Sequence, residues 1–180
     1  MLNKRTKILL TAFEPYGGND TNISQKVLEA IPKDVAKLLL PVSFRRAPEV
    51  LNEAIGQFRP DVIIAMGQAA EGDKIRLERL AINMMDSAKG DNDGYLPDEE
   101  IICNETPLAL KTSLPVKQIC ADCINAGFPT KVSNSAGLYV CNRIYFEALR
   151  HTTNSLFVHI PKNMEVETAK QTINQLIKYF

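Results

Sequence analysis

The run Asp61-Val-Ile-Ile-Ala-Met66 decides the fold of this chain. Every residue after Asp61 is apolar, without the alternation of a strand that has one face in water. A short continuous apolar run of this kind is typical of a strand buried on both faces, as in the centre of a parallel sheet. Residues 48–58 precede it and carry apolar residues at helical spacing, so we expect a helix to lead into this central strand.

Strand and helix patterns alternate outward from this run to both ends of the chain. The expected strands cover residues 7–13, 35–42, 61–66, 74–83, 130–134 and 156–160. The first expected helix begins near Ser24, and the four others cover residues 48–58, 114–126, 140–149 and 165–179. The alternation predicts an α/β three-layer sandwich with a mostly parallel, twisted central sheet and helices on both faces. We expect a single domain over residues 1–180. Residues 88–104, which begin polar and rich in Gly and Asp, are expected to form the most mobile loop.

The composition excludes several classes of partner. Lys plus Arg and Asp plus Glu both number 21, so there is no charge bias toward nucleic acid or an anionic membrane. No apolar stretch approaches the ~20 residues of a membrane span. The N-terminus is basic, but the apolar run after it is short and leads into Glu14, so we interpret it as a first strand rather than a signal peptide. We therefore expect a cytoplasmic protein that binds neither nucleic acid nor membrane.

The four cysteines are expected to be free thiols, because the chain shows no secretory signal. Cys120 and Cys123 form a Cys-x-x-Cys pair, but a single pair without a second pair or a nearby histidine is weak support for zinc. The pair also lies inside a helical pattern, where we expect buried structural thiols. No metal site is predicted.

Cys141 stands in a different setting, in the run Ser133-Asn-Ser-Ala-Gly-Leu-Tyr-Val-Cys-Asn142. We interpret this run as a strand end, a turn around Gly137 and the first turn of a helix. Unpaired N–H groups and partial positive charge at a helix N-terminus favour thiolate over thiol. His159, one of two histidines, lies at the end of an apolar, strand-like run. A cysteine and a histidine in these places suggest a thiol hydrolase.

The strand-end rule brings the two residues together. In open α/β sheets, sites gather beyond the carboxyl ends of the strands. If their strands are parallel, the loops after Phe13, Met66, Asn134 and His159 lie near one another. Alone, Cys141 and His159 each have an ordinary interpretation as core residues, but their shared place at this edge favours a catalytic pair.

A Cys–His pair needs a third group that orients the imidazole. Glu78 lies in an otherwise apolar strand pattern, where an acid is either exposed on the outer face of the strand or has a role in the site. Asp86 and Asp91, on the following loop, are alternatives. His151 follows the expected helix 140–149, where a cation is favourable in any case, so a structural role suffices for it.

Two further features at the same edge could form a ligand pocket. Phe13 and Tyr16 frame a loop that contains Gly17 and Gly18, and aromatic residues there could wall an apolar pocket. Gly67-Gln68 follows the central strand and offers amide groups to a polar ligand. Each feature also has a plain structural explanation, as a core strand end and as a tight turn.

Taken together, the motifs resemble those of the pyroglutamyl peptidase I family, cysteine peptidases that remove N-terminal pyroglutamate from peptides. Five segments carry the resemblance, occur in the family's order and span most of the chain: Thr11-Ala-Phe-Glu-Pro-Tyr-Gly-Gly18, Met66-Gly-Gln-Ala69, Glu78-Arg-Leu-Ala-Ile-Asn83, the run around Cys141, and Phe157-Val-His-Ile-Pro161. The resemblance implies a phosphorylase/hydrolase-like fold. It also implies a catalytic triad of Cys141 as nucleophile, His159 as base and acid, and Glu78 as the orienting carboxylate.

The resemblance further implies how substrate is bound. The family's pyroglutamate pocket is lined by aromatic residues that match Phe13, Tyr16 and Tyr139, with Val140 beside the last of these and the backbone of Gln68 on the lactam. A neutral lactam needs an apolar slot and a few amide hydrogen bonds, so no metal or cofactor is implied. The expected partners are peptides with an N-terminal pyroglutamate, and a homo-oligomer, dimer or tetramer, is expected from the family.

The chain departs from the family pattern in one loop. An arginine proposed in the family to stabilise the oxyanion falls at Ala88, beside Lys89. The family's Cys-Asn-His is Cys141-Asn142-Arg143 here, and the segments around His159 are shorter than usual. Two alternatives therefore stay open beside the peptidase: a related cysteine amidohydrolase for another small lactam or acyl substrate, and a weakly active or non-catalytic binding relative.

Overall fold

The computed structural model describes residues 6–33 and 35–180 and confirms the alternation of strands and helices. The strands are β1 (Ile8–Phe13), β2 (Ala36–Leu40), β3 (Val62–Ala69), β4 (Ile75–Glu78), β5 (Leu80–Ile82), β6 (Ala109–Lys111), β7 (Thr130–Ser133) and β8 (Ser155–Pro161). The helices are α1 (Ile23–Ala30), α2 (Arg46–Phe58), α3 (Val116–Asn125), α4 (Val140–His151) and α5 (Val166–Ile177).

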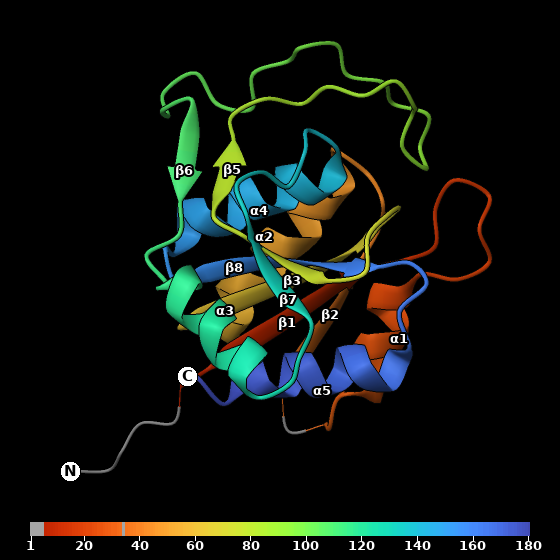
Figure 1. Cartoon of the computed structure of the whole chain (residues 1–180). Coiled ribbons are helices and arrows are strands. Elements are labelled where there is room, and N and C mark those ends of the chain that lie inside the picture. The colour runs from red at the N-terminus through yellow and green to blue at the C-terminus, as the bar shows by residue number, and fades with distance from the viewer. Residues whose placement is uncertain (1–5, 34) are drawn as a thin grey trace.

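The strands form a large sheet and a small one (Figure 1). The large sheet has the order β2-β1-β3-β8-β4-β7, with β2, β1, β3 and β8 parallel to one another. β4 runs antiparallel to β8 and parallel to β7. The small sheet pairs β5 with β6 in antiparallel register. The expected mostly parallel sheet is therefore confirmed, with two strands reversed at one edge.

Helices cover both faces of the large sheet, as expected for a three-layer sandwich. α1, α3 and α5 pack on one face, and α2 and α4 pack on the other (Figure 1). β3 lies in the middle of the sheet, and all eight of its residues are buried. Its apolar run is long because both faces of a central strand meet apolar side chains rather than water.

Two strand predictions need correction. The run over residues 74–83 is not one strand, because the chain leaves the large sheet after Glu78 and continues as β5 beside β6. β6 itself was not predicted, since three residues are too few for a periodic signal. β3 extends to Ala69, beyond the expected end at Met66, so Gly67 and Gln68 lie inside the strand rather than in a turn after it.

The helix boundaries follow local capping. Asn22 caps α1, and its Oδ1 accepts a hydrogen bond from the Ser24 backbone N–H at 3.0 Å. α3 has no side-chain cap, and the hydroxyl of Ser113, three residues before the helix begins, donates to Asn154 Oδ1 at 2.8 Å. Among the described residues, no helix has both the length and the apolar character that a membrane crossing requires.

Residues 88–104, expected to be the most mobile loop, are fastened to the body at several points. The buried Asp91 carboxylate accepts the Phe44 N–H at 2.8 Å. Asn92 Nδ2 donates to Glu14 Oε1 at 3.1 Å. The Tyr139 hydroxyl donates to the Gly90 carbonyl at 3.2 Å. These bonds hold the first half of the loop over the end of the sheet where β1, β3 and β8 terminate.

The paired cysteines of α3 are buried structural thiols, as predicted. Cys120 and Cys123 are almost completely buried in the core between α3 and the sheet. Burial raises the pKa of the Cys123 thiol to about 11. Within residues 6–33 and 35–180, no group of three His, Cys, Asp or Glu side chains is placed to hold a metal ion.

Asn142 joins α4 to the small sheet. Its side chain is fully buried, accepts the Ile82 N–H at 2.8 Å, and donates to the carbonyls of Ile82 at 2.8 Å and Met84 at 3.0 Å. A second link comes from Tyr145, whose hydroxyl donates to the Glu78 carbonyl at 2.8 Å. Together they fix the start of α4 against the chain that follows β4.

Replacing Asn142 with alanine is expected to lower the free energy of unfolding by about 2–4 kcal/mol, because three backbone groups would lose their partner inside the protein. Urea denaturation of the two proteins measures the difference. Asn163→Ala is the matched control: Asn163 is exposed, and a change within about 0.5 kcal/mol is expected there. Equal effects of the two substitutions would contradict the role given to Asn142.

Candidate active site

Three of the predicted site residues lie where parallel strands end at one edge of the sheet. Phe13 ends β1, Gln68 is the penultimate residue of β3, and His159 lies two residues before the end of β8. The loop after Asn134 also reaches this edge, since Ala136 and Tyr139 lie beside Phe13, Gln68 and His159, but the expected parallel direction of the strand before it is wrong. β7 runs against β8 and ends with Ser133 at the level of Phe157, so the chain must turn back before it reaches α4.

Gly67 allows α4 to approach the sheet closely enough to bring Cys141 to this edge. A Cβ atom on Gly67 would lie 2.8 Å from Cys141 Sγ and 2.8 Å from Phe157 Cζ. Gly67 is the register partner of His159 on the adjacent parallel strand, so the two residues face the same side of the sheet. Cys141 and His159 therefore lie on the α4 side of the sheet, where both line one pocket.

His159 is held by a buried carboxylate on the neighbouring antiparallel strand. Its Nδ1 lies 2.8 Å from Glu78 Oε1, and Glu78 is fully buried. An ionised carboxylate only accepts hydrogen bonds, so Nδ1 carries the proton and Nε2 is left to accept one. The Phe157 ring packs against the imidazole with a centroid distance of 4.8 Å, which further limits rotation of the ring.

The two alternative acids, Asp86 and Asp91, do not orient the imidazole. Asp91 is occupied by backbone N–H groups, those of Phe44, Asp93 and Tyr95. Asp86 makes no side-chain hydrogen bond to His159 in the described part of the chain. The second histidine, His151, is the last residue of α4, and its Nε2 lies 2.6 Å from Asn52 Oδ1. Only Glu78 of the three acids contacts the site histidine.

Arg76 supplies the nearest cation to this buried carboxylate. It is the register partner of His159 on β4, and its Nε lies 3.6 Å from Glu78 Oε1. Among the described residues, neither Arg76 Nε nor Glu78 Oε2 has a hydrogen-bond partner, although both atoms are buried. The guanidinium therefore stabilises the carboxylate by charge rather than by a hydrogen bond.

A pocket of about 170 Å³ opens directly in front of Cys141 and His159. All five residues predicted to bind substrate line it, namely Phe13, Tyr16, Gln68, Tyr139 and Val140. Sequence reasoning missed Asn22, Val42 and Ala136. Asn22 could have been found from its position as a helix cap, but Val42 and Ala136 carry no chemical signal and reach the pocket only through the fold.

The described lining of the pocket is largely aromatic, and His159 is the one acidic or basic side chain in it apart from the phenols and the thiol. The rings of Tyr16 and Tyr139 lie 6.2 Å apart at 40°, and Tyr139 packs edge-on against Phe44 at 5.2 Å. Gln68 Oε1 accepts the Ile23 N–H at 3.1 Å, which fixes its side chain toward α1. An apolar cavity of about 150 Å³ holds benzene, so this pocket has room for one five-membered ring.

Cys141 lies at the opening of α4, as predicted, but the expected lowering of its pKa is wrong. Burial, followed by the charge of Glu78, raises the pKa of the Cys141 thiol to about 12. Burial outweighs the favourable helix N-terminus because a thiolate loses its hydration there. The N-terminus of α4 has no side-chain cap, so the backbone N–H groups of its first turn are available to a ligand.

Ala88 and Lys89 lie outside the pocket. They line a second hollow that adjoins it and that also includes Tyr16, Gln68 and Tyr139. Both residues are exposed. Lys89 therefore does not take the place of the family's oxyanion arginine inside the catalytic pocket.

Comparison with known proteins agrees with the motifs and the geometry. The family model described as pyroglutamyl peptidase matches residues 6–175. A pyrrolidone-carboxylate peptidase of Thermococcus kodakarensis is 40% identical over 88% of this chain and 82% of its own length. The crystal structure of pyroglutamyl peptidase I from Bacillus amyloliquefaciens superposes with a TM-score of 0.88, at 30% identity and 94% coverage of both chains.

A second solved structure is still more similar in shape. The pyrrolidone carboxyl peptidase of Fervidobacterium islandicum superposes with a TM-score of 0.92, at 30% identity and 97% coverage of both chains. Sequence and structure thus agree over nearly the whole length of the chain. The chain belongs to the pyroglutamyl peptidase family.

Proposed function

We propose that this protein hydrolyses the amide bond that follows an N-terminal pyroglutamyl residue, with Cys141 as nucleophile, His159 as base and acid, and Glu78 as the orienting carboxylate. One observation carries the proposal: Cys141 and His159 line the same uncharged aromatic pocket, and the buried Glu78 bonds to the far side of the imidazole. A homo-oligomer, a cytoplasmic location and a single domain over residues 1–180 stay predictions.

The raised pKa of Cys141 decides how the thiol is activated. The thiol is protonated in the resting protein, so the proton must leave as the sulfur attacks. Sγ bonds to the carbonyl carbon of the pyroglutamyl group, and His159 Nε2 takes the thiol proton. Glu78 stabilises the resulting imidazolium through its hydrogen bond to Nδ1.

The remaining steps use the same groups. The tetrahedral oxyanion is stabilised by the backbone N–H groups in the first turn of α4. These groups have no side-chain cap, and the helix N-terminus carries a partial positive charge. The C–N bond then breaks, and His159 returns its proton to the leaving amine. Water attacks the thioester with His159 as base, which releases pyroglutamate and restores the thiol.

The lining of the pocket explains why a lactam would be selected. The lactam ring is neutral, so it can leave water and enter an aromatic slot at little cost. An ordinary N-terminal ammonium would be buried without a counter-charge, which is far more costly. Among its described lining residues, the pocket has no carboxylate to pair with an ammonium. Apart from the phenols and the thiol, its one ionisable group is the imidazole, which accepts a proton in the reaction.

Cys141→Ala is expected to reduce cleavage of a pyroglutamyl-coumarin amide by at least about 10⁴-fold, because no other group can form the thioester. Release of the fluorescent amine measures the rate. Cys103→Ala is the matched control, since Cys103 is also a half-buried free thiol but does not line the pocket. Substantial activity in Cys141→Ala would exclude the proposed mechanism.

Gly67→Ala tests the close approach of α4 to the sheet. The new methyl group would lie 2.8 Å from the nucleophilic sulfur, so Cys141 must move away from its place beside His159. We expect kcat/KM to fall by about 100-fold or more, since displacements of about 1 Å at a reacting atom have effects of this size.

The control for this change is Gly56→Ala in α2. A Cβ on Gly56 meets no atom within 4 Å, so the substitution adds helix propensity and leaves the site alone. Gly56→Ala should keep normal kinetics. If Gly67→Ala also kept them, the sulfur would not be confined by β3.

The protonation state of the resting thiol can be measured directly. We expect iodoacetamide to alkylate Cys141 more slowly than Cys103 at pH 7, because burial raises the pKa of Cys141 to about 12, whereas the Thr106 hydroxyl and the Glu105 backbone lower that of Cys103. Alkylation of Cys141 should rise as the pH is increased above 9. Mass spectrometry of the modified peptides follows both sites. Faster labelling of Cys141 at pH 7 would indicate a resting thiolate–imidazolium pair and would contradict proton transfer during attack.

A further inference from the structure

A second hollow, of about 590 Å³, continues outward from the catalytic pocket, and we call it the outer groove. It shares Tyr16, Gln68 and Tyr139 with the pocket. Its other walls come from the loops that follow β1, β3 and β8 and from the segment that contains Lys89. Nothing in the catalytic steps proposed above requires this groove.

The arrangement of the two hollows shows where the rest of a substrate must go. The inner side of the pocket is formed by buried residues, among them Phe13, Val42 and Val140. The side shared with the outer groove is formed by the half-buried Tyr16 and Tyr139. A peptide whose first ring fills the pocket therefore leaves it along the outer groove.

The outer groove is lined by two lysines and, among the described residues, by no carboxylate. The chain as a whole carries equal numbers of acidic and basic residues, so this local excess is not a consequence of composition. Lys89 lies next to Gly90, whose carbonyl is fixed by the Tyr139 hydroxyl. Lys162 directly follows β8. The two ammonium groups thus reach the groove from two separate segments of the chain.

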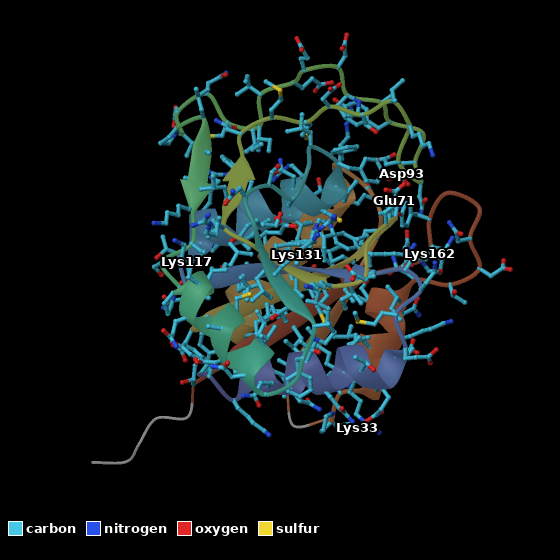
Figure 2. The ribbon with its side chains drawn as sticks, in the orientation of Figure 1. Lys33, Glu71, Asp93, Lys117, Lys131 and Lys162 are labelled. Carbon is cyan, nitrogen blue, oxygen red and sulfur yellow. The ribbon has the colours of Figure 1, made fainter. Side chains whose placement is uncertain are left out.

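Neither ammonium is neutralised by a neighbouring acid in the part of the chain that the structure describes. Lys162 Nζ donates to the neutral Asn19 Oδ1 at 3.0 Å, which uses one of its three donors and holds the side chain beside the loop after β1 (Figure 2). Residues 6–33 and 35–180 contain no carboxylate within 4.0 Å of Lys89 or Lys162. Glu71 lies at the same end of the sheet (Figure 2) but does not line the groove.

We propose that the outer groove is a subsite for a carboxylate on the leaving part of the substrate, held between Lys89 and Lys162. The carboxylate is either the free C-terminus of a short pyroglutamyl peptide or the acidic side chain of the residue after pyroglutamate. This inference rests on the proposed function and adds a preference within its substrate class. It also gives Lys89 a task different from oxyanion stabilisation.

The test compares kcat/KM for three peptides: pyroglutamyl-alanine amide, pyroglutamyl-alanine with a free carboxylate, and pyroglutamyl-glutamate amide. The first is neutral, and the other two carry the carboxylate in its two possible places. At low salt the wild-type protein is expected to favour at least one charged peptide over the neutral one by about three- to tenfold, the size expected of two exposed charge pairs. The preference should shrink toward one at about 1 M NaCl, where the screening length is about 3 Å.

The variants are Lys89→Gln, Lys162→Gln, their combination, and Lys117→Gln as the control. Lys117 is an exposed lysine on α3, well away from Lys162 (Figure 2). The combined variant should lose the preference, and Lys117→Gln should keep it. Each variant is judged by its own ratio of charged to neutral peptide, so a general change in activity or folding cancels.

The outcomes separate this inference from the proposed function. No turnover of any of the three peptides by the wild-type protein would refute the peptidase itself. Turnover of the neutral peptide without a preference, or a preference that survives the double substitution, would refute the subsite alone. If Lys89→Gln lowered kcat equally for all three peptides, Lys89 would act on the reaction and not on the carboxylate.

Discussion

The buried ion of Glu78 is the constraint on which the rest of the site depends. A carboxylate inside a protein is costly unless charge and hydrogen bonds offset its loss of water. Here one oxygen accepts the His159 N–H, Arg76 Nε lies at 3.6 Å, and the other oxygen has no partner among the described residues. An apolar residue would stabilise the fold better at this position. The retention of the acid is understandable only if the orientation of His159 matters more than the stability that is lost.

The reversed edge of the sheet makes this arrangement possible. Because β4 runs against β8, Arg76 lies opposite His159 and Glu78 opposite Phe157, and all four side chains face α4. A parallel strand on this side of β8 would have required a long crossover from β3, whereas the short segment 70–74 leads from β3 into β4 on the far side of β8. Asn142 and Tyr145 then fasten α4 to the same segment, so that the helix carrying Cys141 and the strand carrying Glu78 are held as one unit.

The sequence predicted the parts of the site whose chemistry is local. Cys141 and His159 stand out because a helix opening and a strand end are visible in the residue pattern, and Phe13 and Gln68 follow from the strand-end rule. The direction of β4 and β7 could not be read from the pattern, since periodicity contains no information on the orientation of a strand.

The pKa of Cys141 was missed for a related reason: a helix N-terminus is visible in sequence, but burial beside Glu78 is a property of the packed structure. Gly67 resembles a turn residue and instead lies inside β3, where the missing side chain leaves room for Cys141 of α4.

The charges of the site are separated by depth, and this separation matches the chemistry of the substrate. Glu78 and Arg76 lie behind the imidazole, where they act on its orientation and do not line the pocket. The pocket presents aromatic rings and amide groups to the ring that it must bind, so a neutral lactam fits and an ammonium does not. Lys89 and Lys162 stand outside, where water still solvates them and where the variable part of a peptide would pass. Selection of the first residue thus depends on the absence of charge, whereas any selection of the following residue depends on exposed charge and is correspondingly weak and sensitive to salt.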